Sequence, residues 1–201
     1  MTLPALLSKL SVRTPRYVTV QGRTIPDDDV SVVDGLHYHP QHGHVTPVRP
    51  HTNHGGELPK EGKNSPWWSA QPGTLQAEAD AMSRAFPGFV QTEVDGRPAW
   101  RGNLDTGRGT FGVTIVHRPD HGLPRVIPDR PHRFRRRAGR RLRPSPHLYV
   151  NGDLCIAGQS DWNPVEDDAT TVVAWTAHWL ASFTEWWISG LWPCEGTTAD
   201  A

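Results

Sequence analysis

Residues 169–189 carry the pattern that most restricts how this chain can fold. Bulky side chains recur there at steps of three and four residues, which is the spacing of one face of an α-helix. The set comprises Val172, Val173, Trp175, Thr176, Trp179, Leu180, Phe183, Trp186 and Trp187. Acidic residues precede the segment and Gly190 follows it, as is typical of a helix start and a helix end. The pattern predicts a long helix that buries a tryptophan-rich face, with Trp175 and Trp179 in the core.

The sequence ahead of this helix predicts a shorter helix and then a meander of strands. The helix is expected over residues 75–86, and Pro87-Gly88 ends it. Four strand-like runs follow, separated by turn signals such as Asp95-Gly96. They lie at residues 89–94, 98–104, 110–116 and 125–127. This order predicts an α+β fold: an N-terminal helix, a four-stranded antiparallel meander, an irregular loop and the long C-terminal helix.

Residues 1–70 are predicted to form a partly irregular extension, and residues 71–201 the folded domain. Strand-like runs occur in the extension at 16–20 and 30–33. A polar segment rich in Pro and Gly follows, with six histidines: His37, His39, His42, His44, His51 and His54. Such a segment buries too little apolar area to offset its ordering entropy. Its spacing fits no standard zinc pattern, so a solvated linker is favoured over a metal site, and no cofactor is predicted.

Charge and cysteine content limit the class of protein. The 201 residues have a formal net charge of +0, so total charge points to neither nucleic acid nor membrane. Cys155 and Cys194 fit a reducing compartment, although a disulfide between them stays open. No apolar run approaches the roughly 18 residues of a membrane span, and the N-terminus lacks a secretory signal. We therefore expect a soluble cytoplasmic protein.

Residues 147–156 contain the candidate chemistry, because they place a cysteine after a glycine turn. The segment reads His-Leu-Tyr-Val-Asn-Gly-Asp-Leu-Cys-Ile, and a Trp-Asn-Pro turn follows at 162–164. A cysteine between two aliphatic residues is often an inert core residue. Thiolate chemistry requires instead a reachable sulfur whose pKa is not raised by deep burial. Gly152 permits a turn that a side chain would block, so we expect Cys155 to be presented at the surface.

This segment resembles the active-site region of ubiquitin-conjugating enzymes. In that family a His-Pro-Asn loop precedes a Gly-x-(Ile/Leu)-Cys-Leu segment, and a Trp-x-Pro turn opens the next helix. Residues 152–156 match the cysteine segment, and residues 162–164 match the turn. The tryptophan-rich end, 175–192, is similar to that of the conjugating-enzyme-like proteins of bacterial anti-phage CBASS operons. The resemblance covers residues 75–193 and implies a ubiquitin-conjugating (UBC-like) fold.

The resemblance implies a cysteine-dependent acyltransferase that carries the C-terminus of a partner protein as a thioester on Cys155. The donor would be a CD-NTase, which is a cGAS-like nucleotidyltransferase, or a ubiquitin-like protein. A separate activating enzyme would supply the activated donor, because the chain has no nucleotide-binding glycine loop. The supporting residues would be His147, Asn151, Gly152, Asp161 and Trp162. His147 would hold the loop and Asp161 would orient an incoming amine. Leu148-Tyr149 stands where the family has Pro-Asn, so the family's oxyanion-stabilising Asn has no counterpart.

Seven arginines crowd into residues 133–143, just before this loop. They favour a dock for an acidic partner over nucleic-acid binding, since Phe134 is the single aromatic residue among them. The predicted partner-binding residues are Arg135, Arg136, Arg137, Trp186 and Trp187. Two alternatives to the enzyme remain: a non-catalytic module of the same fold that docks through these residues, and a nucleic-acid-binding protein.

Overall fold

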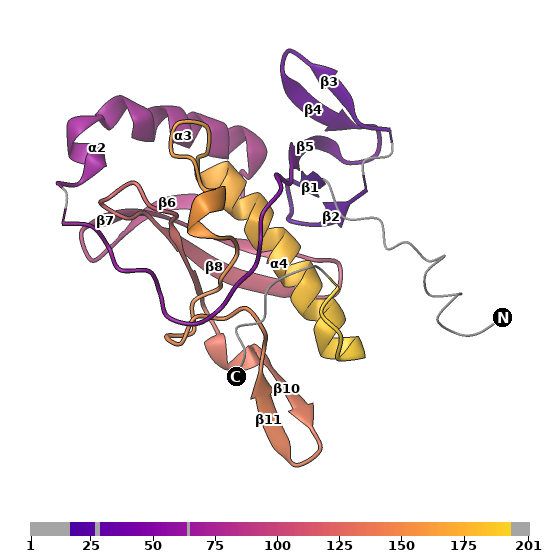
Figure 1. Cartoon of the computed structure of the whole chain (residues 1–201). Coiled ribbons are helices and arrows are strands. Elements are labelled where there is room, and N and C mark those ends of the chain that lie inside the picture. Colours follow the sequence, from indigo (N-terminus) through magenta and orange to yellow (C-terminus); the bar gives the residue numbers. More distant parts are fainter. Residues whose placement is uncertain (1–16, 27–28, 64, 194–201) are drawn as a thin grey trace.

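The structure, a computed structural model, describes residues 17–26, 29–63 and 65–193 (Figure 1). The first strands are β1 (Tyr17–Thr19), β2 (Thr24–Ile25), β3 (Ser31–Val33), β4 (Leu36–His39) and β5 (Gly43–Pro47). The helices are α2 (Trp67–Ala70), α3 (Pro72–Ala85) and α4 (Ala169–Ser189). Between α3 and α4 lie β6 (Val90–Val94), β7 (Arg97–Asp105), β8 (Thr110–Val116), β9 (Arg125–Pro128), β10 (Arg135–Ala138) and β11 (Arg141–Pro144). Two short 3₁₀ turns, Pro131–Arg133 and Gln159–Asp161, complete the set.

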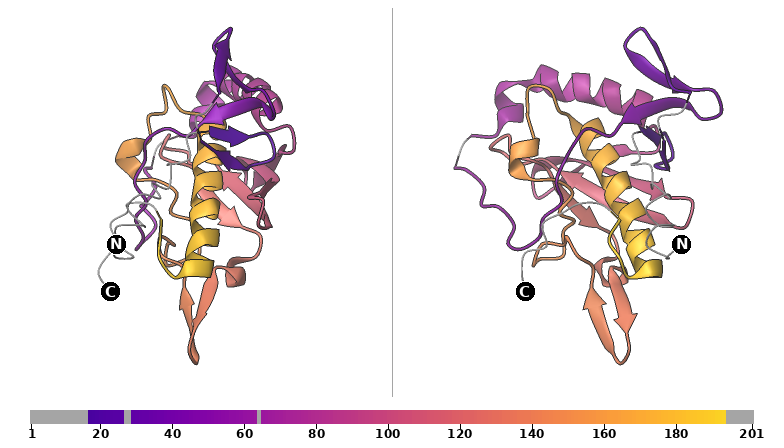
Figure 2. Two further views of the ribbon diagram at one scale, coloured as in Figure 1. Left: turned by 90° about the vertical axis from the view of Figure 1, so that its right-hand side faces the viewer. Right: turned by 45° about the vertical axis from the view of Figure 1, so that its right-hand side comes forward.

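A four-stranded antiparallel meander in the order β6-β7-β8-β9 forms the main sheet. α4 crosses one face of this sheet, and α3 packs against α4 (Figure 2). The predicted helix, the four-strand meander and the long helix are therefore confirmed. α3 begins at Pro72, earlier than expected, because proline is tolerated in the first turn of a helix, where its missing N–H is not needed.

α4 is the centre of the core, and its ends are fixed as the sequence predicts. Asp168 caps the helix by accepting a hydrogen bond from the backbone N–H of Thr170 at 2.8 Å. Gly190 ends it in the left-handed conformation, at φ 84°. Trp175 and Trp179 are fully buried, as predicted. Aromatic rings from the sheet and from the arginine segment surround the helix, which explains why it tolerates so many bulky residues.

A buried carboxylate ties α3, the sheet and α4 together. Glu78 of α3 accepts a hydrogen bond from the indole N–H of Trp100 at 2.7 Å and lies 2.8 Å from the Nε2 atom of His117. Its second oxygen accepts the backbone N–H of Ala169, the first residue of α4, at 3.1 Å. Burial alone would raise the pKa of Glu78, but the bonds from His117, Trp100 and Ala169 together lower it below its ordinary value. No local pattern in the chain indicates this interaction.

The extension is more regular than predicted. It forms a five-stranded antiparallel sheet in the order β2-β1-β5-β4-β3, so the expectation of an irregular histidine-rich segment is wrong for β4 and β5. The strands are short, but Val18 and Val45 are buried and the sheet contacts α4. The apolar area that stabilises this sheet is thus supplied by a helix distant in sequence, which a local pattern does not reveal. The expected strands at 16–20 and 30–33 correspond to β1 and β3.

The turn between β1 and β2 packs directly on the main sheet. Gly22 has φ +94°, and a Cβ atom there would lie 2.5 Å from the side chain of Leu104. Gln21 also accepts the backbone N–H of Asp105 at 2.8 Å. Only glycine permits this approach. The predicted domain boundary near residue 70 falls at the end of α2, and the division into two domains stays a prediction.

The arginine-rich segment forms a hairpin. β10 and β11 pair antiparallel, with Arg135 opposite Pro144 and Arg137 opposite Leu142. The hairpin projects from the body of the molecule (Figures 1 and 2). Among the helices of the described ranges, none has the length and apolar character needed to cross a membrane.

We expect Glu78→Gln to lower the free energy of unfolding by about 1–3 kcal/mol at pH 7, because a buried charged acceptor is lost. The pKa of Glu78 is lowered in the folded state, so its ionised form stabilises the fold above the ordinary value of 4.5, and this stabilisation is lost as the pH falls through the folded-state pKa. The difference from wild type should therefore narrow below pH 4.5. Urea unfolding at several pH values measures this difference in the free energy of unfolding. Glu93→Gln, at an exposed position of β6, is the control; an equal loss in both variants would contradict the assignment.

Candidate active site

Residues 147–155 form a closed turn that leads into Cys155. The backbone N–H of Tyr149 donates to the carbonyl of Asp153 at 2.9 Å, and that of Gly152 donates to the carbonyl of Tyr149 at 2.9 Å. Gly152 has φ +92°, a conformation that L side chains rarely adopt. The structure therefore contains the glycine turn that the sequence predicts.

The sulfur of Cys155 is not at the surface. This free cysteine has an exposed fraction of 0%, so the predicted surface position is wrong for this structure. Burial raises the pKa of the Cys155 thiol, while hydrogen bonds from the Tyr149 side chain and the His54 backbone act in the opposite direction. Deep burial with a raised pKa makes the thiol a poor nucleophile in this arrangement. Cys194, the other half of the disulfide considered above, lies outside the described residues.

Residues 49–56, which we call the strap, lie over the turn. The strap runs from the end of β5 alongside α4 (Figure 1). His54 hydrogen-bonds to the thiol through its backbone, and its carbonyl lies 2.5 Å from the Nδ1 atom of His147. The backbone N–H of Val150 donates to the carbonyl of Gly56 at 2.9 Å. A piece of the extension therefore covers the cysteine through main-chain contacts, which no periodic pattern in the sequence could indicate.

Polar contacts anchor the other end of the strap. The guanidinium of Arg49 pairs with Asp167 at 2.5 Å and with Glu166 at 2.9 Å. The carbonyl of Arg49 accepts the indole N–H of Trp175 at 2.9 Å. The strap is thus attached both to α4 and to the residues just before it.

Two histidines continue this anchor. The Nδ1 atom of His51 lies 2.8 Å from the carbonyl of Arg49, and its Nε2 atom lies 3.1 Å from the Nδ1 atom of His178. Burial lowers the pKa of His51, and it lowers the pKa of His178 to about 4. Both rings are therefore neutral at pH 7. The geometry then fixes the tautomers: His51 donates from Nδ1, and its Nε2 accepts from His178.

His147 and Asn151 both hold the turn. The carbonyl of His147 accepts the backbone N–H of Cys155 and the indole N–H of Trp179, each at 3.1 Å. The side-chain oxygen of Asn151 accepts the backbone N–H of Asp153 at 3.1 Å. These contacts are made by the main-chain carbonyl of His147 and by the acceptor oxygen of Asn151, and the loop-holding role of the His147 side chain stays a prediction.

Asp161 and Trp162 lie between the strap and neighbouring loops. One carboxylate oxygen of Asp161 accepts the backbone N–H of Thr52 at 2.8 Å and that of Gly158 at 2.9 Å. The indole N–H of Trp162 donates to the carbonyl of His121 at 2.8 Å. The role predicted for Asp161, orienting an amine, stays a prediction, and the present contacts give this carboxylate a structural part.

The predicted partner-binding residues divide into buried and exposed members. Trp186 has an exposed fraction of 8% and packs on Phe183, whereas Trp187 is 54% exposed. Arg136 donates from Nε to the carbonyl of Trp187 at 2.9 Å, which joins the hairpin to the end of α4. Arg135 and Arg137 are exposed. The end of α4 at Trp187 therefore lies against the hairpin, while Trp186 belongs to the core.

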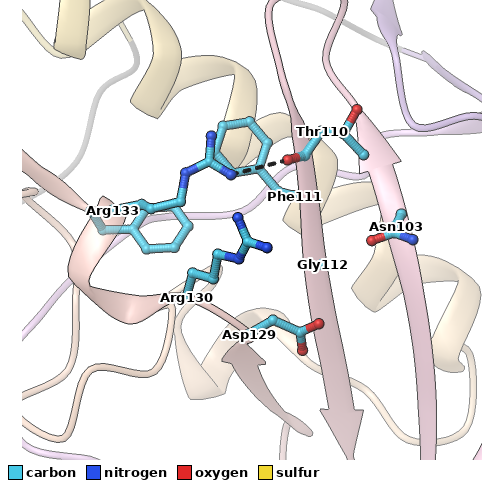
Figure 3. Close-up of a pocket in the computed structure, with 8 residues that line it drawn as sticks. Asn103, Thr110, Phe111, Gly112, Asp129, Arg130 and Arg133 are labelled. Carbon is cyan, nitrogen blue, oxygen red and sulfur yellow. Dashed lines mark hydrogen bonds between the residues drawn. The ribbon is translucent and has the colours of Figure 1, made fainter.

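A polar pocket of about 180 Å³ opens beside the sheet (Figure 3). Its lining comprises Asn103, Thr110, Phe111, Gly112, Asp129, Arg130, Arg133 and Phe134. The guanidinium of Arg133 lies 5.3 Å from the centre of the Phe111 ring and donates to the carbonyl of Thr110 at 3.4 Å. This pocket could not be predicted, because no feature of the amino-acid sequence distinguishes Arg130 and Arg133 from the neighbouring arginines.

A larger cavity of about 670 Å³ lies where α2, α3 and the loop before α4 meet. Trp67 and Trp162 line it, together with the buried pair of Glu78 and His117. Trp67 stacks on His121 with ring centres 4.9 Å apart. No group of three or more His, Cys, Asp or Glu side chains placed to hold a metal occurs among the residues that the structure describes.

Comparison with known proteins assigns the region that contains this site. The family model described as E2-CBASS, Type II CBASS E2 protein, matches residues 78–199, which is more than half of the chain. No curated protein and no solved structure matches the chain.

Gly152→Ala should lower the free energy of unfolding by about 1–2 kcal/mol, because alanine is strained at a positive φ. Gly88→Ala is the matched control, since a Cβ at Gly88 meets nothing within 4 Å and its φ is ordinary. Thermal unfolding of both variants checks the expectation. A Gly152 variant as stable as the Gly88 variant would show that the turn does not depend on this conformation.

Proposed function

This chain belongs to the Type II CBASS E2 protein family, and we propose that it acts there as an acyl carrier whose thioester forms on Cys155. Membership gives the protein an E2-like role in anti-phage CBASS and partners within the same system. The proposal adds the nucleophile and the chemistry.

The position of Cys155 supports the proposal best. It lies inside the family-matched region, at the end of the glycine turn and ahead of the Trp162–Pro164 turn. Two donors, the Tyr149 side chain and the His54 backbone, already hydrogen-bond to its sulfur. Such donors stabilise a thiolate, and donors near the sulfur can also stabilise the oxyanion of an acyl-transfer step.

The proposed reaction has two acyl transfers. The Cys155 thiolate attacks the activated C-terminal carbonyl of a donor, forms a thioester and releases the activating group. An amine of the target then attacks the thioester, forms an amide and returns the thiol. The donor is a CD-NTase or a ubiquitin-like protein, and a separate activating enzyme supplies it in activated form.

Burial of the sulfur limits this chemistry. An acyl donor cannot reach a sulfur with no exposed area, and the raised pKa of Cys155 further lowers the thiolate fraction. The proposed function therefore requires a second arrangement in which the thiol is uncovered. If the sulfur stays sealed, the protein acts by binding.

The test is the covalent adduct itself. With the donor and its activating enzyme, wild type should form an adduct that a reducing thiol cleaves, because a thioester exchanges with thiols. Cys155→Ser should form a thiol-resistant ester, and Cys155→Ala should form none. Cys194→Ser is the control and should charge as wild type does. Unchanged anti-phage activity of Cys155→Ala would reject the acyl-carrier function. Gel electrophoresis with and without reductant measures the adduct.

A binding module of the same fold is the second candidate, and the hairpin favours it. β10 and β11 project from the body and carry exposed Arg135 and Arg137, with the 63% exposed Leu142 opposite Arg137 and the end of α4 at Trp187 nearby. Basic and apolar side chains on one projecting element suit an acidic partner surface.

Replacing Arg135 and Arg137 together by Glu should weaken binding of the CD-NTase partner about tenfold or more, because both charges are reversed. Arg84→Glu, exposed on α3, is the control. Calorimetry at two salt concentrations measures the affinity, which should fall at higher salt. The binding module predicts that Cys155→Ala keeps both binding and defence. Unchanged affinity of the hairpin variant would reject this docking surface.

A further inference from the structure

The strap is held by polar contacts and by the packing of the His51 ring against Trp175, whose ring centres lie 5.4 Å apart. The strap reads Arg-Pro-His-Thr-Asn-His-Gly-Gly and contains no large aliphatic or aromatic hydrocarbon side chain. Its bonds run to carboxylates, to an indole N–H, to the His147 ring and to main-chain groups. Water can replace such partners when the segment lifts, whereas a buried apolar side chain would lose the hydrophobic free energy. The strap can therefore open without unfolding the core.

The strap also hydrogen-bonds to backbone groups of the turn to which an extended peptide would bind in its place. Gly56 pairs in parallel with Tyr149, and its carbonyl accepts the backbone N–H of Val150. Two residues earlier, the His54 backbone reaches the sulfur. A peptide that adds to the edge at Val150 in the same way would likewise place main-chain groups at the thiol. Gly55 and Gly56 carry no side chains, so this path accepts a narrow chain.

We propose that the strap is a displaceable cover lying in the path of an extended acyl-donor C-terminus, so that the donor must replace it to reach Cys155. The part of this inference that concerns the donor rests on the proposed function. The part that concerns the cover does not, because it predicts the reactivity of a thiol without any partner.

The cover is tested by alkylation of Cys155 with iodoacetamide in a Cys194→Ser background, followed by mass spectrometry. Arg49→Ala removes the pairs with Asp167 and Glu166, and Thr52→Pro removes the N–H bound by Asp161. Each should speed alkylation about threefold to tenfold. Arg101→Ala removes an ion pair with Asp129 on the sheet and should leave the rate unchanged.

Denaturant dependence separates local opening from unfolding. Alkylation through strap opening should change little with urea below the unfolding transition, because little surface is exposed. The proposal would be overturned if Cys155 were alkylated as fast as a free thiol in the protein whose strap carries no substitution. A rate that follows global unfolding in every variant would also overturn it, since the core itself would then have to open.

The path is tested with a peptide ending in Gly-Gly-Cys and activated as a pyridyl disulfide. The Cys155 thiolate attacks the peptide sulfur, a mixed disulfide forms and pyridine-2-thione leaves. The tethered peptide should remove hydrogen-exchange protection from the Thr52 amide, which binds Asp161 in the sealed state. The Val150 amide should stay protected, because the peptide takes the place of Gly56. Retained protection at Thr52 would overturn the shared path, even if Cys155 charges normally. Failure of enzymatic charging with normal strap opening would reject the proposed function instead.

Discussion

Two tryptophans one helical turn apart connect the core of this protein to its candidate site. Trp175 and Trp179 are fully buried on α4, yet each uses its indole N–H outside the helix. Trp175 donates to the carbonyl of Arg49 in the strap, and Trp179 donates to the carbonyl of His147 at the start of the cysteine turn. Burying these rings therefore orders the strap and the turn at the same time. A buried indole N–H needs a partner, so the strap and the turn each satisfy one tryptophan of α4 in the sealed arrangement.

The sealed thiol has a chemical consequence of its own. A buried cysteine with a raised pKa resists both oxidation and premature acylation, because the thiolate is the reactive form. The same groups that seal the sulfur, Tyr149 and the His54 backbone, hydrogen-bond to it. If the strap leaves, Tyr149 remains on the turn itself, whereas the His54 donor goes with the strap. The strap therefore controls access to the sulfur, and the Tyr149 side chain is the donor that stays beside the sulfur when the strap opens.

Prediction from the sequence succeeded for elements whose buried residues recur at a regular spacing along the chain. The helical repeat of α4 extends over many residues, so the sequence predicts its buried face. It also predicts the ends of the helix at Asp168 and Gly190. The four strands of the meander were readable from their turn residues. The expected exposure of Cys155 failed because it was inferred from the local turn at Gly152, whereas the sulfur is covered by the His54 backbone, about one hundred residues earlier in the chain. Glu78 was missed for a related reason, since its three partners come from other elements.

The amino-acid sequence by itself determined the long helix, the meander and the glycine turn that leads into Cys155, because each depends on local periodicity or on one backbone conformation. It also carried enough of the family pattern to indicate a conjugating-type protein. Only the tertiary structure decided that the histidine-rich extension forms a sheet on α4, that the arginine segment is a projecting hairpin, and that residues 49–56 cover the sulfur. Those features depend on hydrogen bonds and buried area between residues far apart in the chain, which local patterns do not encode.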